Sequence, residues 1–82
     1  MPGRNLIDIV MPMLSETMSE GVVGAWLKEV GDRVAVGDEL VEIETDKAVV
    51  IYTSDSAGVL AEICATEGAE LPVGAVIARL SP

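Results

Sequence analysis

The sequence contains no histidine and no phenylalanine, and it has one cysteine, one tryptophan and one tyrosine. Without histidine the chain lacks the usual general base and the usual ligand sets for zinc, so we expect no metal site. A single cysteine cannot form a disulfide within the chain, which favours a reducing compartment. With so few aromatic residues, the core must be built from Val, Ile, Leu, Ala and Met, which suits thin, tightly packed β layers.

Positive charge is also scarce, with five Lys and Arg residues against 14 Asp and Glu residues and a formal net charge of −9. This balance repels phosphate backbones and anionic lipid head groups, so we expect no nucleic acid and no membrane as partners. The apolar stretch in the N-terminal segment MPGRNLIDIV is too short to span a bilayer or to form the hydrophobic region of a signal peptide. We therefore expect a soluble, unexported chain.

The length of 82 residues is enough for one domain, 1–82, with a thin core. The apolar residues come in short groups separated by glycine and other turn residues, which indicates strands rather than helices. The sequence therefore predicts an all-β domain with about eight strands. The longer ones are expected over 5–11, 22–28, 39–45, 48–53, 58–65 and 76–80, and the shorter ones near 34–36 and 71–73.

An internal repeat relates the two halves of the chain. A shift of 37 residues, from Gly21 to Gly58, aligns 21–44 with 58–81 without a gap. The glycines and the apolar positions of the first half fall on those of the second, so we expect two similar four-strand units that pack face to face. This predicts a flattened barrel or sandwich with approximate two-fold symmetry. The repeated turn glycines, which we expect to adopt positive φ, are Gly31, Gly37, Gly68 and Gly74.

Lys47 lies in the stretch VEIETDKAVVI, between two apolar runs and at the junction of the two units. The alternating pattern before it and the apolar run after it predict a hairpin with its turn near 45–48. Lys47 should then stand at an exposed tip. Asp-Lys is not among the favoured two-residue turn pairs, so turn chemistry alone does not explain the lysine.

Three roles are open to Lys47 at this point. It could be a solvated turn residue, a catalytic nucleophile or an attachment point for a cofactor. A nucleophilic amine needs a lowered pKa, whereas the neighbouring carboxylates of Glu42, Glu44 and Asp46 act in the opposite direction. A cofactor arm needs only a protruding amine on a small stable scaffold, which the sequence offers.

The segment EIETDKA resembles the modification site of lipoyl domains from the acyltransferase (E2) components of 2-oxo acid dehydrogenase complexes. The similarity extends over 11–21, 26–48 and 58–80, and so covers nearly the whole chain. It implies a flattened β-barrel of two four-stranded antiparallel sheets and lipoate in amide linkage on Lys47. The lipoyl group would act as a swinging arm that carries acyl groups and electrons. The domain itself would be a non-catalytic carrier within an acyltransferase chain.

The same resemblance implies the partners of the domain. Lipoate ligase or lipoyl transferase would attach the cofactor, and a thiamine-dependent decarboxylase (E1) would load it. An acyltransferase domain would unload the acyl group, and dihydrolipoyl dehydrogenase (E3) would reoxidise the arm. The expected location is the cytoplasm, or the mitochondrial matrix if the source is eukaryotic. The closing Ser-Pro looks like the start of a linker, so we expect an excised or N-terminal piece of a longer chain.

Asp46 and Ala48 flank the lysine and are expected to serve its recognition. Biotinyl domains, which share the fold, typically carry Met on both sides of the modified lysine, so lipoate is favoured here. Two alternatives remain, a biotinyl carrier and an unmodified protein-interaction module. Where many lipoyl domains have an acidic residue shortly after this motif, the present chain has three apolar residues at 49–51.

The segment 12–20 makes the first connection longer than its counterpart in the second half. By resemblance, Ser15, Glu16 and Thr17 are expected near Lys47, where they would contact the decarboxylase. Trp26 is expected to pack in or beside the core. Cys64 is expected to be a small buried apolar residue rather than a reactive thiol.

Overall fold

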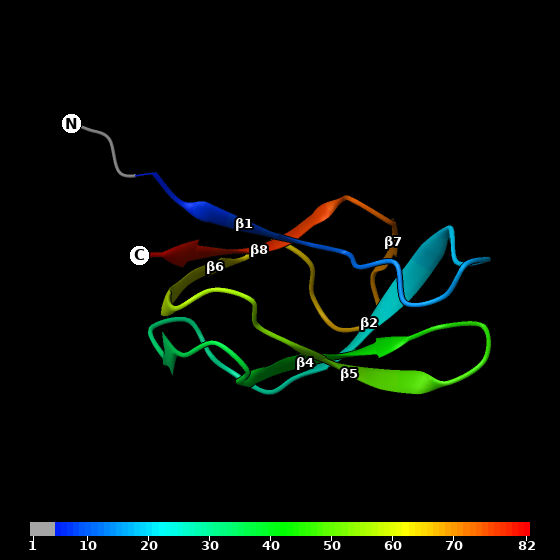
Figure 1. Cartoon of the computed structure of the whole chain (residues 1–82), viewed down its shortest axis with the longest axis horizontal. Coiled ribbons are helices and arrows are strands. Elements are labelled where there is room, and N and C mark those ends of the chain that lie inside the picture. Colours follow the sequence, from blue (N-terminus) through cyan, green and yellow to red (C-terminus); the bar gives the residue numbers. More distant parts are fainter. Residues whose placement is uncertain (1–4) are drawn as a thin grey trace.

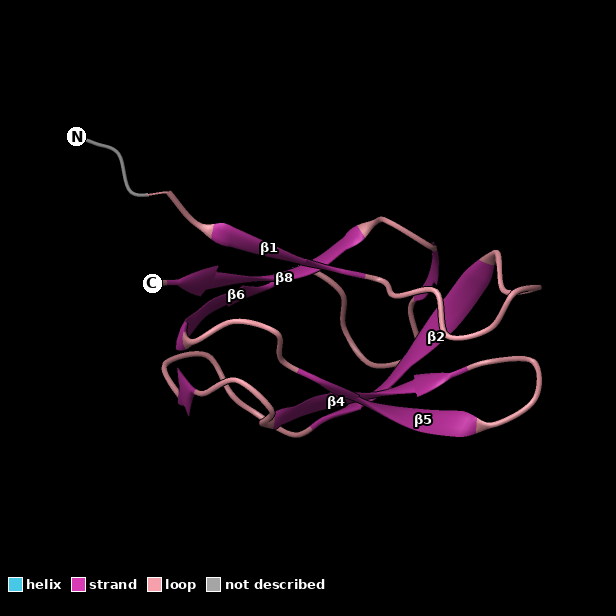
Figure 2. Cartoon of the chain, in the orientation of Figure 1, coloured by secondary structure: helices cyan, strands magenta, loops and turns pink. Residues whose placement is uncertain are grey.

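The computed structural model describes residues 5–82, and these residues form strands, turns and loops without a helix (Figures 1 and 2). No helix that could cross a membrane occurs in this part of the chain. All eight predicted strands are present, with ends that differ by at most two residues from the predicted ones. They are β1 (Ile7–Val10), β2 (Glu20–Trp26), β3 (Arg33–Val34), β4 (Glu39–Glu44), β5 (Val49–Thr53), β6 (Gly58–Ile63), β7 (Glu70–Pro72) and β8 (Val76–Ser81).

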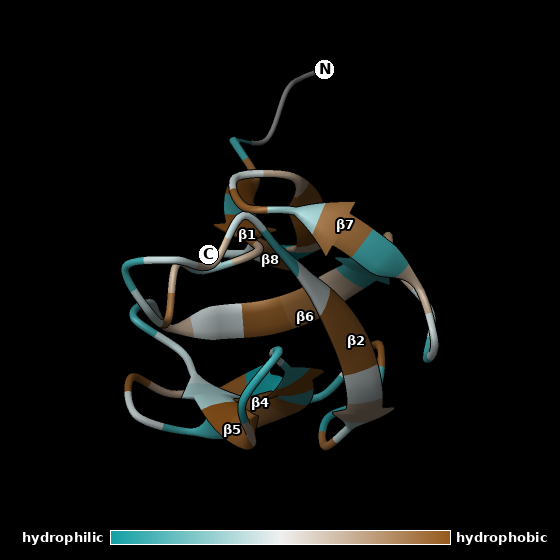
Figure 3. Cartoon of the chain, turned by 90° about the vertical axis from the view of Figure 1, so that its right-hand side faces the viewer, coloured by the Kyte–Doolittle hydropathy of each residue, from teal (hydrophilic) through white to brown (hydrophobic). Residues whose placement is uncertain are grey.

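The strands form two four-stranded sheets in which all neighbours are antiparallel. The first sheet has the order β1-β8-β6-β3, and the second has the order β5-β4-β2-β7. Exchanging β1 to β4 with β5 to β8 converts one order into the other, which is the two-fold relation that the repeat predicts. The sheets are not closed into one barrel. Viewed from the hairpin end, β2 extends from the side of β4 and β5 towards β7 (Figure 3). The predicted flattened barrel-sandwich is confirmed.

The four repeated glycines make the turns of both halves possible. Gly31 and Gly68 have φ values of 99° and 94°, and Gly37 and Gly74 have values of 91° and 93°. An L-residue pays a steric cost in this region, whereas glycine does not. The predicted positive φ is confirmed at each position, and the matching values show that the two halves turn in the same way.

The core lies between the two sheets and is built from aliphatic residues and methionine. Along β4, Val41 and Ile43 point inward, while Glu42 and Glu44 alternate with them on the outer face. Trp26 is half-buried against the core, as predicted, and its indole Nε1 donates a hydrogen bond of 2.8 Å to the carbonyl of Ala65. The buried apolar residues are Ile9, Met11, Met18, Val23, Val34, Leu40, Val41, Ile43, Leu60, Ala65, Ile77, Ala78 and Leu80.

The prediction of a buried Cys64 is wrong. Strand β6 ends at Ile63, and the backbone N–H groups of Cys64 and Ala65 both donate to the carbonyl of Ile77, at 2.8 and 3.1 Å. Two consecutive residues therefore share one partner, and the alternation of sides stops at this point. Ala65 takes the buried position, and the Cys64 side chain is exposed.

Candidate functional site

Lys47 lies in the connection between β4 and β5, at one end of the molecule's long axis (Figure 1). Glu44 and Val49 form the last cross-strand pair, so residues 45–48 make the turn. Lys47 is exposed, as are its predicted recognition flanks Asp46 and Ala48. The predicted hairpin, with the lysine at its tip, is confirmed.

Thr45 organises the turn through its side chain. Its Oγ1 accepts hydrogen bonds from the backbone N–H groups of Lys47 and Ala48, at 3.2 and 3.1 Å. The same hydroxyl donates to the Ala48 carbonyl at 2.9 Å, and the Thr45 N–H donates to that carbonyl at 2.8 Å. The turn contains no residue with positive φ. Asp46 and Lys47 can therefore occupy this turn without the positive φ that favours Asn-Gly or Asp-Gly, because the Thr45 hydroxyl forms hydrogen bonds with the turn backbone.

Sequence reasoning missed this role of Thr45. The available signal was a threonine directly after a strand and two residues before the singled-out lysine, which is the spacing of a side-chain-closed turn. The consequence concerns Lys47 itself. The backbone of Lys47 is held in place although its side chain is exposed.

The two lysines of the chain differ in what their ammonium groups contact. Lys28 Nζ lies 3.4 Å from Asp38 Oδ2 and 3.4 Å from the carbonyl oxygen of Arg33. The Ala35 backbone N–H lowers the pKa of Asp38, and the Lys28 charge acts in the same direction. Lys28 also lies two residues beyond the end of β2, so its predicted place in that strand is wrong.

By contrast, the Lys47 ammonium makes no hydrogen bond and no ion pair within residues 5–82. It is neither buried nor placed beside a cation, so the structure offers neither of the usual means of activating an amine as a catalytic nucleophile. The amine is accessible to an enzyme that would modify it. The geometry therefore suits an attachment point better than a catalytic group.

A groove of about 380 Å³ lies beside the hairpin and brings the long loop next to it. Thr17 from the loop and Thr45 and Asp46 from the hairpin line this groove. Ser15 and Glu16 do not, so only one of the three predicted loop residues shares the groove with the hairpin. Ser15 is half-buried, and its Oγ has no hydrogen-bond partner among the described residues, whereas Glu16 is exposed.

Methionine side chains fix this loop to the core. Met11 and Met18 are both buried, at the start of the loop and near its end. They lie over Gly21, where an added Cβ would meet Met18 Cε at 2.7 Å and Met11 Sδ at 2.9 Å. The loop is therefore more than a surface connector, because its removal would expose part of the core.

Glu20 and Glu70 form a carboxylate pair in the lining of the same groove. A hydrogen bond with Glu70, the negative charge of Glu70 and desolvation together raise the pKa of Glu20 above its usual 4.5. Glu44 and Asp46 also line the groove. The surface beside the hairpin is therefore strongly acidic.

Known proteins are similar to this chain in sequence and in fold. Residues 7–80 match the Biotin_lipoyl family, described as biotin-requiring enzymes. The chain is 49% identical over 76 residues to the dihydrolipoyllysine-residue acetyltransferase component of the pyruvate dehydrogenase complex of Zymomonas mobilis, covering 92% of this chain and 17% of that protein. It is 46% identical over 71 residues to the dihydrolipoyllysine-residue succinyltransferase component of the 2-oxoglutarate dehydrogenase complex of Staphylococcus saprophyticus, covering 87% of this chain and 17% of that protein.

The chain thus spans about one sixth of the length of these curated relatives. A solved structure gives a match over a whole domain. The lipoyl domain of the 2-oxoglutarate dehydrogenase complex from Azotobacter vinelandii superposes with a TM-score of 0.75 and 36% sequence identity, covering 93% of this chain and 96% of that one. The predicted resemblance is confirmed, and the chain belongs to the family of biotinyl and lipoyl domains.

Proposed function

We propose that this chain is a lipoyl carrier domain of an acyltransferase component, with lipoate in amide linkage on Lys47. The observation that carries the proposal is the exposed, unpaired ammonium of Lys47 at the tip of a hairpin fixed by Thr45. The domain does no chemistry itself. It holds the arm at one end of a rigid β structure, so that the dithiolane reaches the active sites of other proteins.

The proposed partners follow from the chemistry of the arm. A ligase or transferase attaches lipoate, and a thiamine-dependent decarboxylase acylates the dithiolane reductively. An acyltransferase domain then passes the acyl group on, and dihydrolipoyl dehydrogenase reoxidises the dithiol. The proposed location is the cytoplasm, or the mitochondrial matrix if the source is eukaryotic.

Incubation of the apo-domain with lipoate ligase, followed by intact-mass measurement and peptide mapping, tests the attachment site. We expect one lipoyl group, carried by the peptide that contains Lys47. Lys47→Arg should abolish the modification. Lys28→Arg is the matched control and should leave it unchanged, since the Lys28 ammonium already pairs with Asp38. Lipoate on the Lys47→Arg domain would contradict the assignment.

The choice of lipoate over biotin is proposed to depend on the flanks Asp46 and Ala48. Replacing both by Met should lower lipoylation and permit some biotinylation by a biotin ligase, with the turn kept because Thr45 is unchanged. Mass spectrometry after incubation with each ligase measures both outcomes. Full lipoylation without biotin uptake would show that the choice is made elsewhere on the domain.

The loop residues Ser15, Glu16 and Thr17 are proposed to contact the decarboxylase. Deleting 14–19 is a poor test because it would remove the buried Met18. We therefore expect the substitutions Ser15→Ala, Glu16→Gln and Thr17→Ala to reduce reductive acylation of the lipoylated domain while leaving its folding intact. Asp55→Asn, in the shorter connection of the second half, makes the same change of charge and serves as control. Equal acylation rates for both variants would leave the loop without this role.

A further inference from the structure

On the outer face of the β1-β8-β6-β3 sheet, one cation pairs with two carboxylates. Arg79 on β8 donates from Nε to Asp8 on β1 at 3.1 Å and from Nη1 to Glu62 on β6 at 3.0 Å. These two carboxylates lie on either side of the cation in the sheet. The hydrogen bonds with Glu62 and Asp8 raise the pKa of Arg79, so the guanidinium stays charged. One cation thus partly neutralises the outer face of this sheet.

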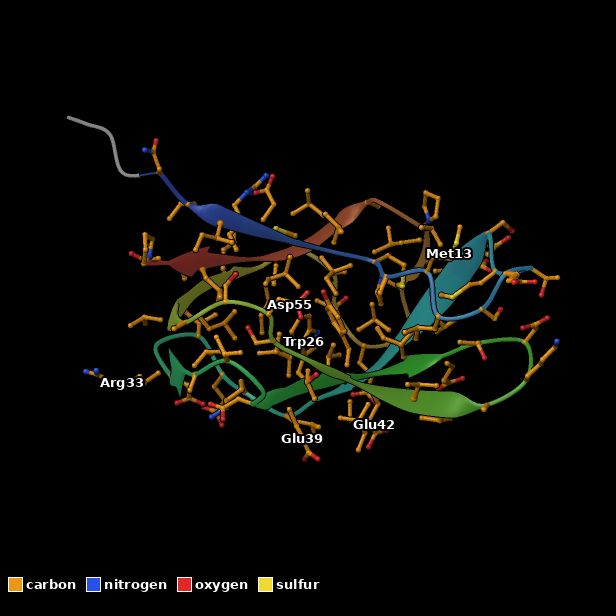
Figure 4. All side chains as sticks on the ribbon, viewed as in Figure 1. Met13, Trp26, Arg33, Glu39, Glu42 and Asp55 are labelled. Carbon is orange, nitrogen blue, oxygen red and sulfur yellow. The ribbon has the colours of Figure 1, made fainter. Side chains whose placement is uncertain are left out.

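The equivalent place on the other sheet carries the opposite charge. The 37-residue shift relates Arg79 on β8 to Glu42 on β4, which is paired with Ile51 on β5. The neighbouring outward pair is Glu44 with Val49. Neither carboxylate forms an ion pair within residues 5–82. Figure 4 shows Glu42 pointing away from the body of the molecule.

Two apolar side chains lie beside these carboxylates. Val49 and Ile51 are 60% and 45% exposed on the edge strand β5, although aliphatic residues of this size are usually covered in a small domain. Each faces one glutamate across the β4–β5 ladder. The resulting surface, which we call the β4–β5 face, consists of Glu42, Glu44, Val49 and Ile51. An apolar side chain flanked by Lys or Arg would complement it.

We propose that the β4–β5 face is the docking surface for the enzyme that attaches lipoate to Lys47, and that this enzyme meets it with an apolar side chain flanked by Lys or Arg. The inference rests on the proposed function. In the attachment step, the Lys47 amine attacks the carbonyl of an activated lipoyl group, either an acyl adenylate, which is a mixed anhydride, or a thioester. The C–N bond forms and the acyl C–O or C–S bond breaks. The amine loses a proton, and AMP or the thiolate leaves with the electron pair of the broken bond.

We assign the β4–β5 face to the attaching enzyme because bond formation takes place at the hairpin itself. Bond formation at Lys47 Nζ requires the active site to close over the hairpin. The β4–β5 face begins at Glu44 and Val49, the residues that pair at the base of the turn. The decarboxylase, which we propose contacts the loop at 15–17, reacts with the far end of the arm, so its contacts need not include the β4–β5 face.

Steady-state lipoylation kinetics of apo-domain variants test the proposal. A charge variant, Glu42→Gln with Glu44→Gln, removes two carboxylates, and an apolar variant, Val49→Thr with Ile51→Thr, keeps β-branched residues in the strand. The control, Glu29→Gln with Glu62→Gln, makes the same change in net charge away from the face. We expect KM for the domain to rise about tenfold in the charge variant and by a similar factor in the apolar one, with kcat preserved. Increasing salt should raise KM of the wild type more than that of the charge variant.

The outcomes separate this proposal from the proposed function. If the wild-type domain acquires no lipoate, the carrier function itself fails. If the wild type is modified but both test variants match the control in KM, the docking surface is refuted. Unchanged lipoylation with a raised KM for reductive acylation would assign the face to the decarboxylase and overturn the present proposal. Circular dichroism of each variant shows whether the fold is retained. If a double variant unfolds, the two corresponding single substitutions are compared with the wild type instead.

Discussion

Each end of the molecule has a groove, and the two grooves differ in charge. The groove beside the hairpin and a second groove at the opposite end are lined by positions that the 37-residue shift relates. At the hairpin end the groove carries four carboxylates, whereas the far groove has Arg33 and mostly apolar neighbours. The equivalent pairs are Glu20 and Ala57, Gly21 and Gly58, Val22 and Val59, Glu44 and Ser81, Thr45 and Pro82, and Glu70 and Arg33.

This difference lies in the side chains, because the turns of the two halves are alike. The turn glycines of the two halves have similar φ values, within about 5° for each related pair. The first half continues from β4 into the Lys47 hairpin, whereas the equivalent point after β8 is Pro82. The two halves therefore provide similar scaffolds whose grooves are lined by different side chains.

The largest expected difference between the ends concerns the paired glycines. A Cβ on Gly58 would meet the backbone oxygen of Ser81 at 2.5 Å, whereas a Cβ on Gly21 would meet only side chains, those of Met18, Met11 and Ile43, the closest at 2.7 Å. A backbone atom cannot move aside as a methionine terminus can. We expect Gly58→Ala to cost about 3 kcal/mol and Gly21→Ala about 1 kcal/mol of unfolding free energy.

Denaturant unfolding of both glycine variants measures these costs. Equal losses would break the comparison, because they would show that the methionines over Gly21 are as immobile as the backbone near Gly58.

A smaller effect is expected at Thr45. Thr45→Val keeps the shape of the side chain but removes the hydroxyl that holds Lys47 and Ala48, so we expect a loss of about 1 kcal/mol in stability. We also expect the lipoylation rate, measured at a domain concentration below KM, to fall about tenfold. A flexible backbone at the lysine presents the amine less often in the reactive geometry.

Thr45→Ser should restore most of the lipoylation rate, since the hydroxyl returns. Ser54→Ala is the remote control: Ser54 Oγ accepts from the N–H of Ser56 at 3.2 Å in a similar turn away from the hairpin. That variant should lose stability without a selective loss of lipoylation. A Thr45→Val domain that is modified at the parent rate would show that the turn needs no fixed backbone.

The smallest effect concerns the carboxylates at the hairpin end. The folded state raises the pKa of Glu20 above 4.5, so it binds the proton more tightly than the unfolded state does. The pair therefore opposes folding when ionised, and this penalty is relieved as pH falls through the raised pKa. Glu70→Gln should lower the pKa of Glu20 in an NMR titration. It should also raise the melting temperature slightly at neutral pH, with the gain disappearing in acid. A pKa of Glu20 that stays raised would exclude Glu70 as its cause.

Most of the fold could be predicted from the sequence because its signals are local. Alternation of apolar and polar residues gave β4, and the repeated glycines gave the turns of both halves. Lys47 was found for the same reason, since it interrupts two strand patterns at the junction of the repeat. These features need only the period of a strand and the conformational range of glycine.

The sequence analysis failed or was incomplete where the local structure depends on side-chain contacts or on a shared hydrogen bond. Cys64 was misplaced because two amides share the Ile77 carbonyl, which no strand pattern reveals. The role of Thr45 depends on the direction of one hydroxyl. The anchoring of the long loop by Met18 depends on the open space above Gly21. Each of these features can be recognised only from the three-dimensional contacts.

The pairing of β1 with β8 has a consequence for the order of assembly. Ile7 lies opposite Leu80, so this ladder joins segments that are far apart in the chain, and closing so long a loop slows folding. The sheet that carries the hairpin draws only on residues 20–72. During synthesis from the N-terminus, all strands beside the lysine have left the ribosome before β8 is available to β1. The sheet that carries the Lys47 hairpin can therefore form before β1 pairs with β8.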